Sequence, residues 1–231
     1  MGSEFADLVS LASVWILPVL IAITFHEAAH AYVAWRLGDD TAYMLGRVSF
    51  NPLKHVDPVG TVIVPTLLLL SPARILFGWA KPVPVNARRL RNPRRDMVLV
   101  ALAGPGINLV LAVASAWLLR WTHLLPEDMQ LWTERNLVNA LTLNILLAVF
   151  NMLPLPPLDG GRVAVGLLPY RLAAPLARLE RYGLFILVGL LLLLPMATRQ
   201  LGLGFDPFGV LVQAPASWIF HGILVLVGLG P

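Results

Sequence analysis

Long runs of apolar residues, each bounded by charged residues, dominate the chain. Five such runs cover residues 8–36, 97–119, 136–155, 182–198 and 207–230. A helix needs ~20 predominantly apolar residues, each rising ~1.5 Å, to cross the hydrocarbon core of a bilayer. The first three runs reach that length, whereas the fourth is short and the fifth carries Pro207 and Pro215, which allow a kink or an interfacial stretch. The pattern predicts an all-α polytopic membrane protein with about five to six transmembrane helices.

A different pattern fills the region between the first two runs. Residues 57–86 are largely apolar but contain five prolines. Proline ends helices and is tolerated in a sheet only at an edge, so this region predicts a short helix followed by an extended segment at 77–86. We expect it to enter the membrane and return on the same side, as a re-entrant helix/strand element. Such an element is stable only where protein or a water-filled cavity surrounds it.

The composition agrees with a membrane protein. Hydrophobic residues make up 58% of the 231 residues and charged residues only 13%, whereas a soluble domain has about 25% charged residues. The chain contains no cysteine, which excludes disulfides. Any metal site must therefore be built from His, Asp or Glu.

Arginines are concentrated in two places. One cluster lies in residues 86–95, directly before the second run, and another comprises Arg171, Arg178 and Arg181. Positively charged loops remain on the cytoplasmic side of a membrane, so both clusters are expected there. The stretch 121–135, which we expect to be an acidic loop, then lies outside. In this orientation the third run approaches the cytoplasm as it ends.

The first run carries three titratable side chains in otherwise apolar surroundings. They are His26, Glu27 and His30, within the sequence ITFHEAAHAYVAW at 23–35. Ionisable groups are costly at membrane depth, so they are usually functional. Residues four apart share a helix face, which allows both imidazoles to bind one zinc ion. In an H-E-x-x-H helix, zinc lowers the pKa of water towards ~7 and the Glu takes its proton. The alternative is a pair of packing histidines beside a salt-bridged Glu.

A catalytic zinc needs a third protein ligand, for which Asp159 is the candidate. His30 lies six residues before Arg36, or ~9 Å along a helix, so we expect the histidines near the cytoplasmic face. The stretch 153–162 should reach the same depth, and Asp159 is its only acid. Two glycines follow Asp159 and leave the backbone free to aim the carboxylate. A competing role for Asp159 is to cap the helix that follows it.

Together these motifs resemble the site-2 protease family of intramembrane zinc metalloproteases. The matching stretches are FHEAAH (25–30), AGPGIN (103–108) and FNMLPLPPLDGGR (150–162). Two further stretches resemble the compact prokaryotic branch without a PDZ domain, LGDDTAYMLGRVSFNPLKHVDPVGT (37–61) and FGWAKPVPVN (77–86). The resemblance implies that His26, His30 and Asp159 bind one Zn²⁺ per chain, and that Glu27 activates the water.

The resemblance also implies a reaction and a setting. The expected reaction is hydrolysis of a peptide bond within or near the transmembrane segment of single-span proteins such as anti-sigma factors, in regulated intramembrane proteolysis. The expected partners are these substrates and the lipid bilayer, with no nucleic acid. The expected location is the cell membrane of a prokaryote, with the active site near the cytoplasmic face. We expect a catalytic membrane core at 6–170 and C-terminal transmembrane helices at 171–231, with residues 1–5 left over from cloning.

Other polar residues have two interpretations each. Asn108 stands one helical turn after Gly104, so the pair either packs closely against a helix or lets the Asn108 amide contact the scissile carbonyl or its oxyanion. Asn151 either contacts substrate or bonds a neighbouring helix. His55 and Asp57 either hold a second metal or serve in turns and caps, and the turn and cap roles are favoured.

Two other functions compete with the peptidase. A metal-binding membrane transporter needs polar residues along a path between both membrane faces, whereas here they gather at one depth. A catalytically idle scaffold has no need of Glu27. The gathering of polar residues at one depth and the presence of Glu27 both favour a zinc metalloendopeptidase.

Overall fold

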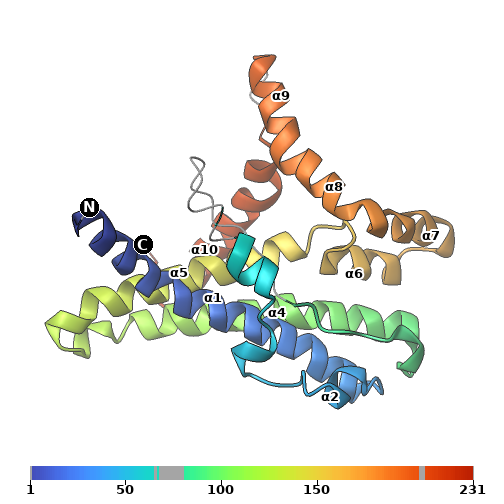
Figure 1. Cartoon of the computed structure of the whole chain (residues 1–231), viewed down its shortest axis with the longest axis horizontal. Coiled ribbons are helices and arrows are strands. Elements are labelled where there is room, and N and C mark those ends of the chain that lie inside the picture. Colours follow the sequence, from blue (N-terminus) through green and yellow to red (C-terminus); the bar gives the residue numbers. More distant parts are fainter. Residues whose placement is uncertain (1, 65–66, 68–80, 203–205, 231) are drawn as a thin grey trace.

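The computed structural model describes residues 2–64, 67, 81–202 and 206–230, and these residues form helices and no strand. This agrees with the predicted all-α class. Figure 1 shows the arrangement of the helical elements. They are α1 (Gly2–Arg36), α2 (Thr41–Met44), η1 (Pro52–Lys54), η2 (Pro58–Ile63), η3 (Ala87–Arg89), α4 (Pro93–Leu119), η4 (Thr122–Leu124), α5 (Glu127–Asn151), α6 (Asp159–Leu167), α7 (Tyr170–Arg178), η5 (Leu179–Tyr182), α8 (Gly183–Val188), η6 (Gly189–Leu193), α9 (Leu194–Gln200), η7 (Gly209–Gln213) and α10 (Ala214–Leu226).

Three long helices form the centre of the molecule. α1, α4 and α5 lie side by side with successive helices antiparallel (Figure 1), and each contacts the other two. Alanines contribute much of the buried face of α1, among them Ala22, Ala31 and Ala34, each 0% exposed. Small side chains let helix backbones approach closely, which is how helices associate in a membrane. α10 packs against α4 and α5 through an apolar core that includes Leu141 and Ile145.

One end of this bundle gathers several chain segments. It holds the end of α1, the start of α4 and the helices α6 and α7 (Figure 1). The Arg91 N–H donates to the Leu37 carbonyl oxygen at 3.1 Å. Asp39, 0% exposed, accepts hydrogen bonds from the Thr41 N–H at 3.1 Å and the Asn86 N–H at 2.5 Å. Both arginine clusters therefore lie at the end where α1 finishes, as the predicted orientation requires.

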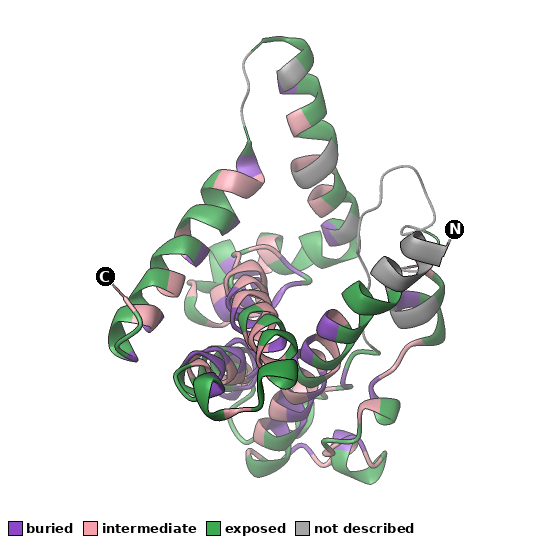
Figure 2. Ribbon diagram, turned by 90° about the vertical axis from the view of Figure 1, so that its left-hand side faces the viewer, coloured by how far each residue is buried: buried purple, intermediate pink, exposed green. Residues whose placement is uncertain are grey.

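Large apolar residues remain exposed on the helices, for example Ile16 of α1 at 57% and Trp218 of α10 at 83%. Figure 2 shows exposed residues along the outer faces of the helices. Extensive apolar surface of this kind suits lipid rather than water. Among the described residues, three helices are long and apolar enough to cross a membrane, namely Val9–Arg36, Pro93–Leu119 and Gly209–Leu226. α5 is 25 residues long but carries four asparagines, which lower its hydropathy. The chain is therefore a helical membrane protein.

Two details differ from the expectations. Residues 127–135, expected in a loop, belong to α5, which begins at Glu127. Glu127 and Asp128 stand in its first turn, where negative charge stabilises the positive end of the helix dipole. Pro215 does not end the helix of the fifth run, because it lies inside the continuous helix Gly209–Leu226, directly after the π-helical turn η7.

The expected re-entrant element lies partly outside the described residues. Its first part is helical as predicted, since residues Pro58–Ile63 form η2. The Asp57 carboxylate caps this turn and accepts the N–H groups of the second and third residues after it at 3.0 and 2.7 Å. Residues 65–66 and 68–80 are outside the described part of the chain.

The last part of that element, residues 81–86, is neither helix nor strand. Val83 is buried and Val85 half-buried, while Pro82 and Pro84 are exposed. Alternating burial is typical of an extended chain. The burial pattern agrees with the extended chain predicted for residues 81–86, but these residues do not form the strand of the predicted helix/strand element.

Candidate metal centre

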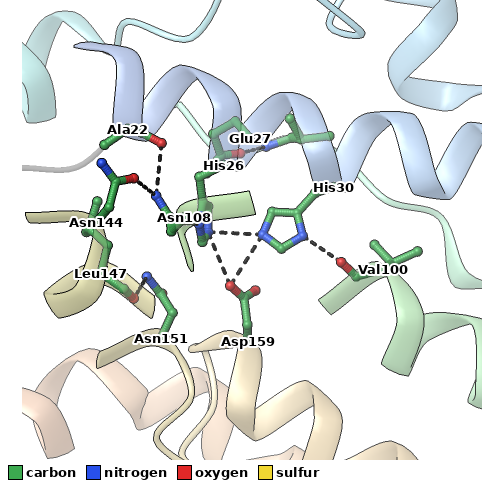
Figure 3. A network of polar contacts seen from close by, with 11 residues as sticks. Ala22, His26, Glu27, His30, Val100, Asn108, Asn144, Leu147, Asn151 and Asp159 are labelled. Atoms are coloured by element: carbon green, nitrogen blue, oxygen red, sulfur yellow. Dashed lines mark hydrogen bonds and ion pairs between the residues drawn. The ribbon is translucent and has the colours of Figure 1, made fainter. Parts of the chain in front are cut away.

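Three buried side chains from two helices converge where α1 finishes (Figure 3). His26 and His30 lie one turn apart on α1, and Asp159 is the first residue of α6. The two Nε2 atoms are 3.0 Å apart. Asp159 Oδ2 lies 3.2 Å from Nε2 of His26 and 3.3 Å from Nε2 of His30. Within the described ranges, these are the residues whose His and carboxylate ligand atoms lie close enough to share a metal ion.

A tight turn between α5 and α6 aims the Asp159 carboxylate at the histidines. A Cβ on Gly160 would lie 2.2 Å from the Met152 carbonyl oxygen, and a Cβ on Gly161 would lie 2.2 Å from the Pro156 nitrogen. The two glycines are thus needed for close approach rather than for the backbone freedom that we expected. Asp159 is itself the first residue of the helix, and its carboxylate faces the imidazoles.

Gly104 on α4 lets both imidazoles lie against that helix. A Cβ at this position would be 2.3 Å from His30 Nε2 and 2.6 Å from His26 Cε1. Gly104 therefore packs closely, as one of its two interpretations predicted. The groups that it accommodates are the two rings, so any larger residue here must displace them.

The outer ring nitrogens of both histidines are hydrogen-bonded. His30 Nδ1 lies 2.7 Å from the Val100 carbonyl oxygen, which can only accept, so this nitrogen carries the proton. His26 Nδ1 lies 2.5 Å from Asn108 Oδ1 and likewise donates. In a neutral imidazole the other nitrogen then presents a lone pair. Two Nε2 lone pairs and Asp159 Oδ2 thus face one another, and such electron-rich atoms repel unless a cation lies between them.

This group fits a zinc ion. Zinc binds nitrogen and oxygen ligands at ~2.0–2.1 Å in a tetrahedron, which separates the ligand atoms by ~3.4 Å. The observed separations are 3.0, 3.2 and 3.3 Å. Asp159 Oδ2 is buried and has no hydrogen-bond partner among the described residues, as a ligand atom requires. Two imidazoles and a carboxylate also form a donor set of catalytic zinc sites, which leave one position open.

Glu27 lies beside this group on α1 and is half-buried. Its Oε2 accepts the backbone N–H of Val83 at 2.8 Å. Val83 packs among buried residues of α1 and α2, and Arg47 donates to the Lys81 carbonyl oxygen at 2.6 Å. Residues 81–86 therefore pass directly beside Glu27, and their backbone sets the direction of its carboxylate.

Asn108 lies behind the His26 ring and is 0% exposed. Besides the bond from His26 to its oxygen, its nitrogen donates to Asn144 Oδ1 at 2.7 Å and to the Ala22 carbonyl oxygen at 3.4 Å. Both ends of its amide are thus engaged within the protein (Figure 3). These contacts favour a role for Asn108 in orienting the His26 ring over contact with a scissile carbonyl.

The remaining candidates have other hydrogen-bond partners, although Asn151 lies beside the site (Figure 3). Asn151, half-buried at the end of α5, donates to the Leu147 carbonyl oxygen at 3.0 Å. His55 Nε2 donates to the Ser49 carbonyl oxygen at 2.8 Å, and Asp57 caps η2. His55 and Asp57 therefore have the turn and cap contacts that the sequence favoured.

Three groups at the site were not identified from the sequence: the Asn144 side chain, the Val100 carbonyl and the Val83 N–H. Asn144 had a signal, since it is one of four asparagines in α5. Polar side chains in an apolar membrane helix usually bond neighbouring helices or serve function. The two backbone groups had no signal, because almost every residue type supplies them.

Comparisons with known proteins identify the family. The model of peptidase family M50 matches residues 123–194. A Bacillus subtilis protein named "Putative zinc metalloprotease YwhC" is 40% identical over 196 residues, which cover 83% of this chain and 85% of that relative. The chain belongs to peptidase family M50. A Mycolicibacterium smegmatis protein named "Putative zinc metalloprotease Rip2" is 33% identical over 183 residues, or 78% of this chain and 66% of that relative. No solved structure matches the chain.

Membership of M50 confirms the resemblance to the site-2 proteases and makes the chain a zinc metalloendopeptidase. It favours the peptidase over the transporter and the idle scaffold. The names of both relatives also imply zinc, which agrees with the donor set of His26, His30 and Asp159.

Proposed function

We propose that this M50 peptidase holds one zinc ion per chain through His26, His30 and Asp159. With it, the chain hydrolyses a peptide bond within or near the transmembrane segment of single-span membrane proteins. The observation that carries the proposal is the convergence of three buried ligand atoms, no two of them more than 3.3 Å apart. When both imidazoles are neutral and carry their proton on Nδ1, no donor hydrogen lies between the three ligand atoms, which is the arrangement that a cation needs.

Glu27 is the proposed general base. Bound zinc supplies a Lewis acid that lowers the pKa of water towards ~7 and polarises a carbonyl oxygen. The Glu27 carboxylate accepts the proton of the attacking water and then delivers it to the leaving amine. The Val83 N–H, at 2.8 Å from Oε2, holds the carboxylate in one direction during both transfers. Asn151 is the proposed contact to the substrate backbone, whereas Asn108 acts through His26.

We propose that the site lies in the membrane near the cytoplasmic face of a prokaryotic cell. Support comes from the two arginine clusters at the end of the bundle where α1 finishes. The three candidate spans, α5 and the helical stretch 183–200 would give about five transmembrane helices, with a re-entrant element at 57–86. The catalytic core is then 6–170 and the C-terminal transmembrane part 171–231.

Cysteine labelling tests this orientation, because the chain has no cysteine of its own. Asp128 and Arg91 are both exposed and lie at opposite ends of the bundle. In intact cells, an impermeant thiol reagent should label Asp128→Cys and leave Arg91→Cys unlabelled until the cells are opened. The reverse pattern would contradict the cytoplasmic assignment, and labelling of both variants in intact cells would contradict the separation of the two ends by the membrane.

The extended segment 81–86 is the proposed place where an unwound substrate lies. A peptide bond in a helix is shielded by that helix, so it must unwind before hydrolysis. The segment passes Glu27 and has its two prolines, Pro82 and Pro84, exposed. An extended chain can add beside such a segment. Substrates of the anti-sigma-factor type, cut in regulated intramembrane proteolysis, are the proposed biological targets.

The function is tested by cleavage of a single-span substrate in lipid vesicles, with the cut positions read by mass spectrometry. We expect cuts in the cytoplasmic half of the span. Gly and Pro lower helix stability by ~1 and ~3 kcal/mol relative to Ala, so their replacement by Leu near the cut should slow hydrolysis. Substrate binding should persist in those variants. Cuts clustered in the outer half, or rates indifferent to Gly and Pro, would contradict the proposed depth and unwinding.

A further inference from the structure

A buried chain of side-chain amides connects α5 to the metal centre (Figure 3). Asn144 on α5 is 1% exposed and Asn108 on α4 is 0% exposed. Asn144 Nδ2 donates to the Ala140 carbonyl oxygen at 2.8 Å. Asn108 Nδ2 donates to Asn144 Oδ1 at 2.7 Å, and Asn108 Oδ1 lies 2.5 Å from His26 Nδ1. Three helices thus contribute to one hydrogen-bonded series.

The direction of this series is fixed at its far end. The Ala140 carbonyl can only accept, so the nitrogen of the Asn144 amide must face it. The Asn144 oxygen then faces Asn108, which must present its own nitrogen. The Asn108 oxygen is left for His26, whose Nδ1 must therefore carry the proton. Every donor meets an acceptor in this direction, whereas reversal of either amide would bring two acceptors or two donors together.

The two histidines differ in how their protons are fixed. His30 donates to the Val100 carbonyl, a backbone group whose direction the helix sets. His26 donates to a side-chain amide, which is nearly the same shape in both of its orientations. Something must therefore choose the orientation of Asn108. Its bond to the Ala22 carbonyl, at 3.4 Å, favours the same orientation but is long.

We propose that Asn144 is a positioning residue that fixes the tautomer of His26 through Asn108. With the Asn108 oxygen towards His26, Nδ1 is protonated and the Nε2 lone pair faces Asp159 and His30. With Asn108 reversed, His26 would need its proton on Nε2, where it would block metal binding. This proposal rests on the proposed role of His26 as a zinc ligand, and it assigns Asn144 a part in the affinity of the site for zinc.

The first test compares zinc affinity in two leucine variants of α5. Asn144→Leu keeps the approximate size of the side chain and removes the acceptor for Asn108. Mutation of a residue that hydrogen-bonds a metal ligand lowers metal affinity by about 10–100-fold. We expect a loss near the lower end of this range for Asn144→Leu, because Asn144 acts through Asn108. Asn139→Leu is the matched control, because Asn139 also joins α5 to another helix, by donating to the Val14 carbonyl oxygen of α1 at 3.0 Å, but stands outside the hydrogen-bonded series that ends at His26. It should leave zinc affinity unchanged. The measurement is competition for Zn²⁺ against a chelator in purified full-length protein.

The second test separates orientation from packing. In Asn108→Asp, either carboxylate oxygen accepts the His26 proton, so no second residue is needed to orient the group. Asn144→Leu should therefore lower zinc affinity about tenfold in the wild-type background. In the Asn108→Asp background it should not lower the affinity, because the second oxygen of the introduced carboxylate faces Asn144 Oδ1 and leucine removes that pair of acceptors. A role of Asn144 in helix packing alone would give the same loss in both backgrounds. The absorption bands of the Co²⁺-loaded variants provide a second reading of ligand geometry.

The outcomes distinguish this proposal from the proposed function. Unchanged zinc affinity in Asn144→Leu, or an equal loss in both backgrounds, would overturn the tautomer role while His26 remains a ligand. An equal loss in Asn139→Leu would also overturn it. If His26→Ala binds zinc as tightly as the wild type, the zinc site itself is wrong and the role of Asn144 is rejected with it. A loss for Asn144→Leu alone, cancelled by Asn108→Asp, supports the proposal.

Discussion

Replacing Glu27 with glutamine is expected to lower kcat by about 10²–10⁴-fold, the usual contribution of a general base, while the zinc content of the protein stays the same. Glutamine has the same size, and its amide oxygen still accepts the Val83 N–H that lies 2.8 Å from Oε2. The amide cannot take up the proton of an attacking water. The measurement combines the cleavage rate of a single-span substrate in vesicles with the amount of zinc per chain.

Glu134→Gln is the matched control for this variant. Glu134 lies on α5 near the opposite end of the bundle, where its Oε1 accepts the Thr122 hydroxyl at 3.1 Å. The control should retain both zinc and activity. Near wild-type cleavage by Glu27→Gln would assign the base to another group. Loss of zinc from that variant would instead make Glu27 a ligand.

The residues of the candidate metal centre were largely predictable because they conflict with their surroundings. His26, Glu27 and His30 are conspicuous in an apolar run, since a titratable group at that depth is costly unless it is used. Asp159 was identified because its expected depth in the membrane matches that of the two histidines. The arginine clusters supplied this depth, since they indicate which helix ends lie on the same side. The structure does bring Asp159 within 3.3 Å of both imidazoles. The direction of each helix was enough to place Asp159 near the histidines, without knowledge of how the helices pack.

The supporting contacts were not predictable in the same way. Asn108 was expected either to pack or to face the substrate, and its engagement with His26 depends on how α4 is rotated against α1. Asn144 stands in no motif, and its importance depends on which helix lies beside Asn108. Gly160 was expected to give the backbone freedom, whereas its actual role is to leave room for the Met152 carbonyl. That contact exists only in the folded chain, so the sequence alone does not show it. Sequence patterns report depth and periodicity, whereas these contacts depend on helix rotation.

Removal of the proposed third ligand is expected to have the strongest effect on zinc binding. Asp159→Ala removes the carboxylate whose Oδ2 lies 3.2 Å from His26 Nε2 and 3.3 Å from His30 Nε2. Two imidazoles alone leave a zinc ion under-coordinated. Mutation of a residue that only hydrogen-bonds a metal ligand already lowers metal affinity by about 10–100-fold. Loss of a ligand itself should therefore lower the affinity for zinc by more than ~100-fold. The measurement is competition for Zn²⁺ against a chelator, and proteolysis should be lost in parallel.

Asp57→Asn is the informative control for that variant, because Asp57 is an acid that the sequence had offered for a second metal. Its Oδ1 accepts two N–H groups at the start of η2, and the amide oxygen of asparagine can still accept them. Zinc affinity should therefore not change. Full zinc occupancy in Asp159→Ala under the same chelator would exclude Asp159 as a ligand. If Asp57→Asn lost zinc at the same time, the third ligand would be Asp57. Loss of zinc from Asp159→Ala alone would leave the carboxylate at the start of α6 as the ligand.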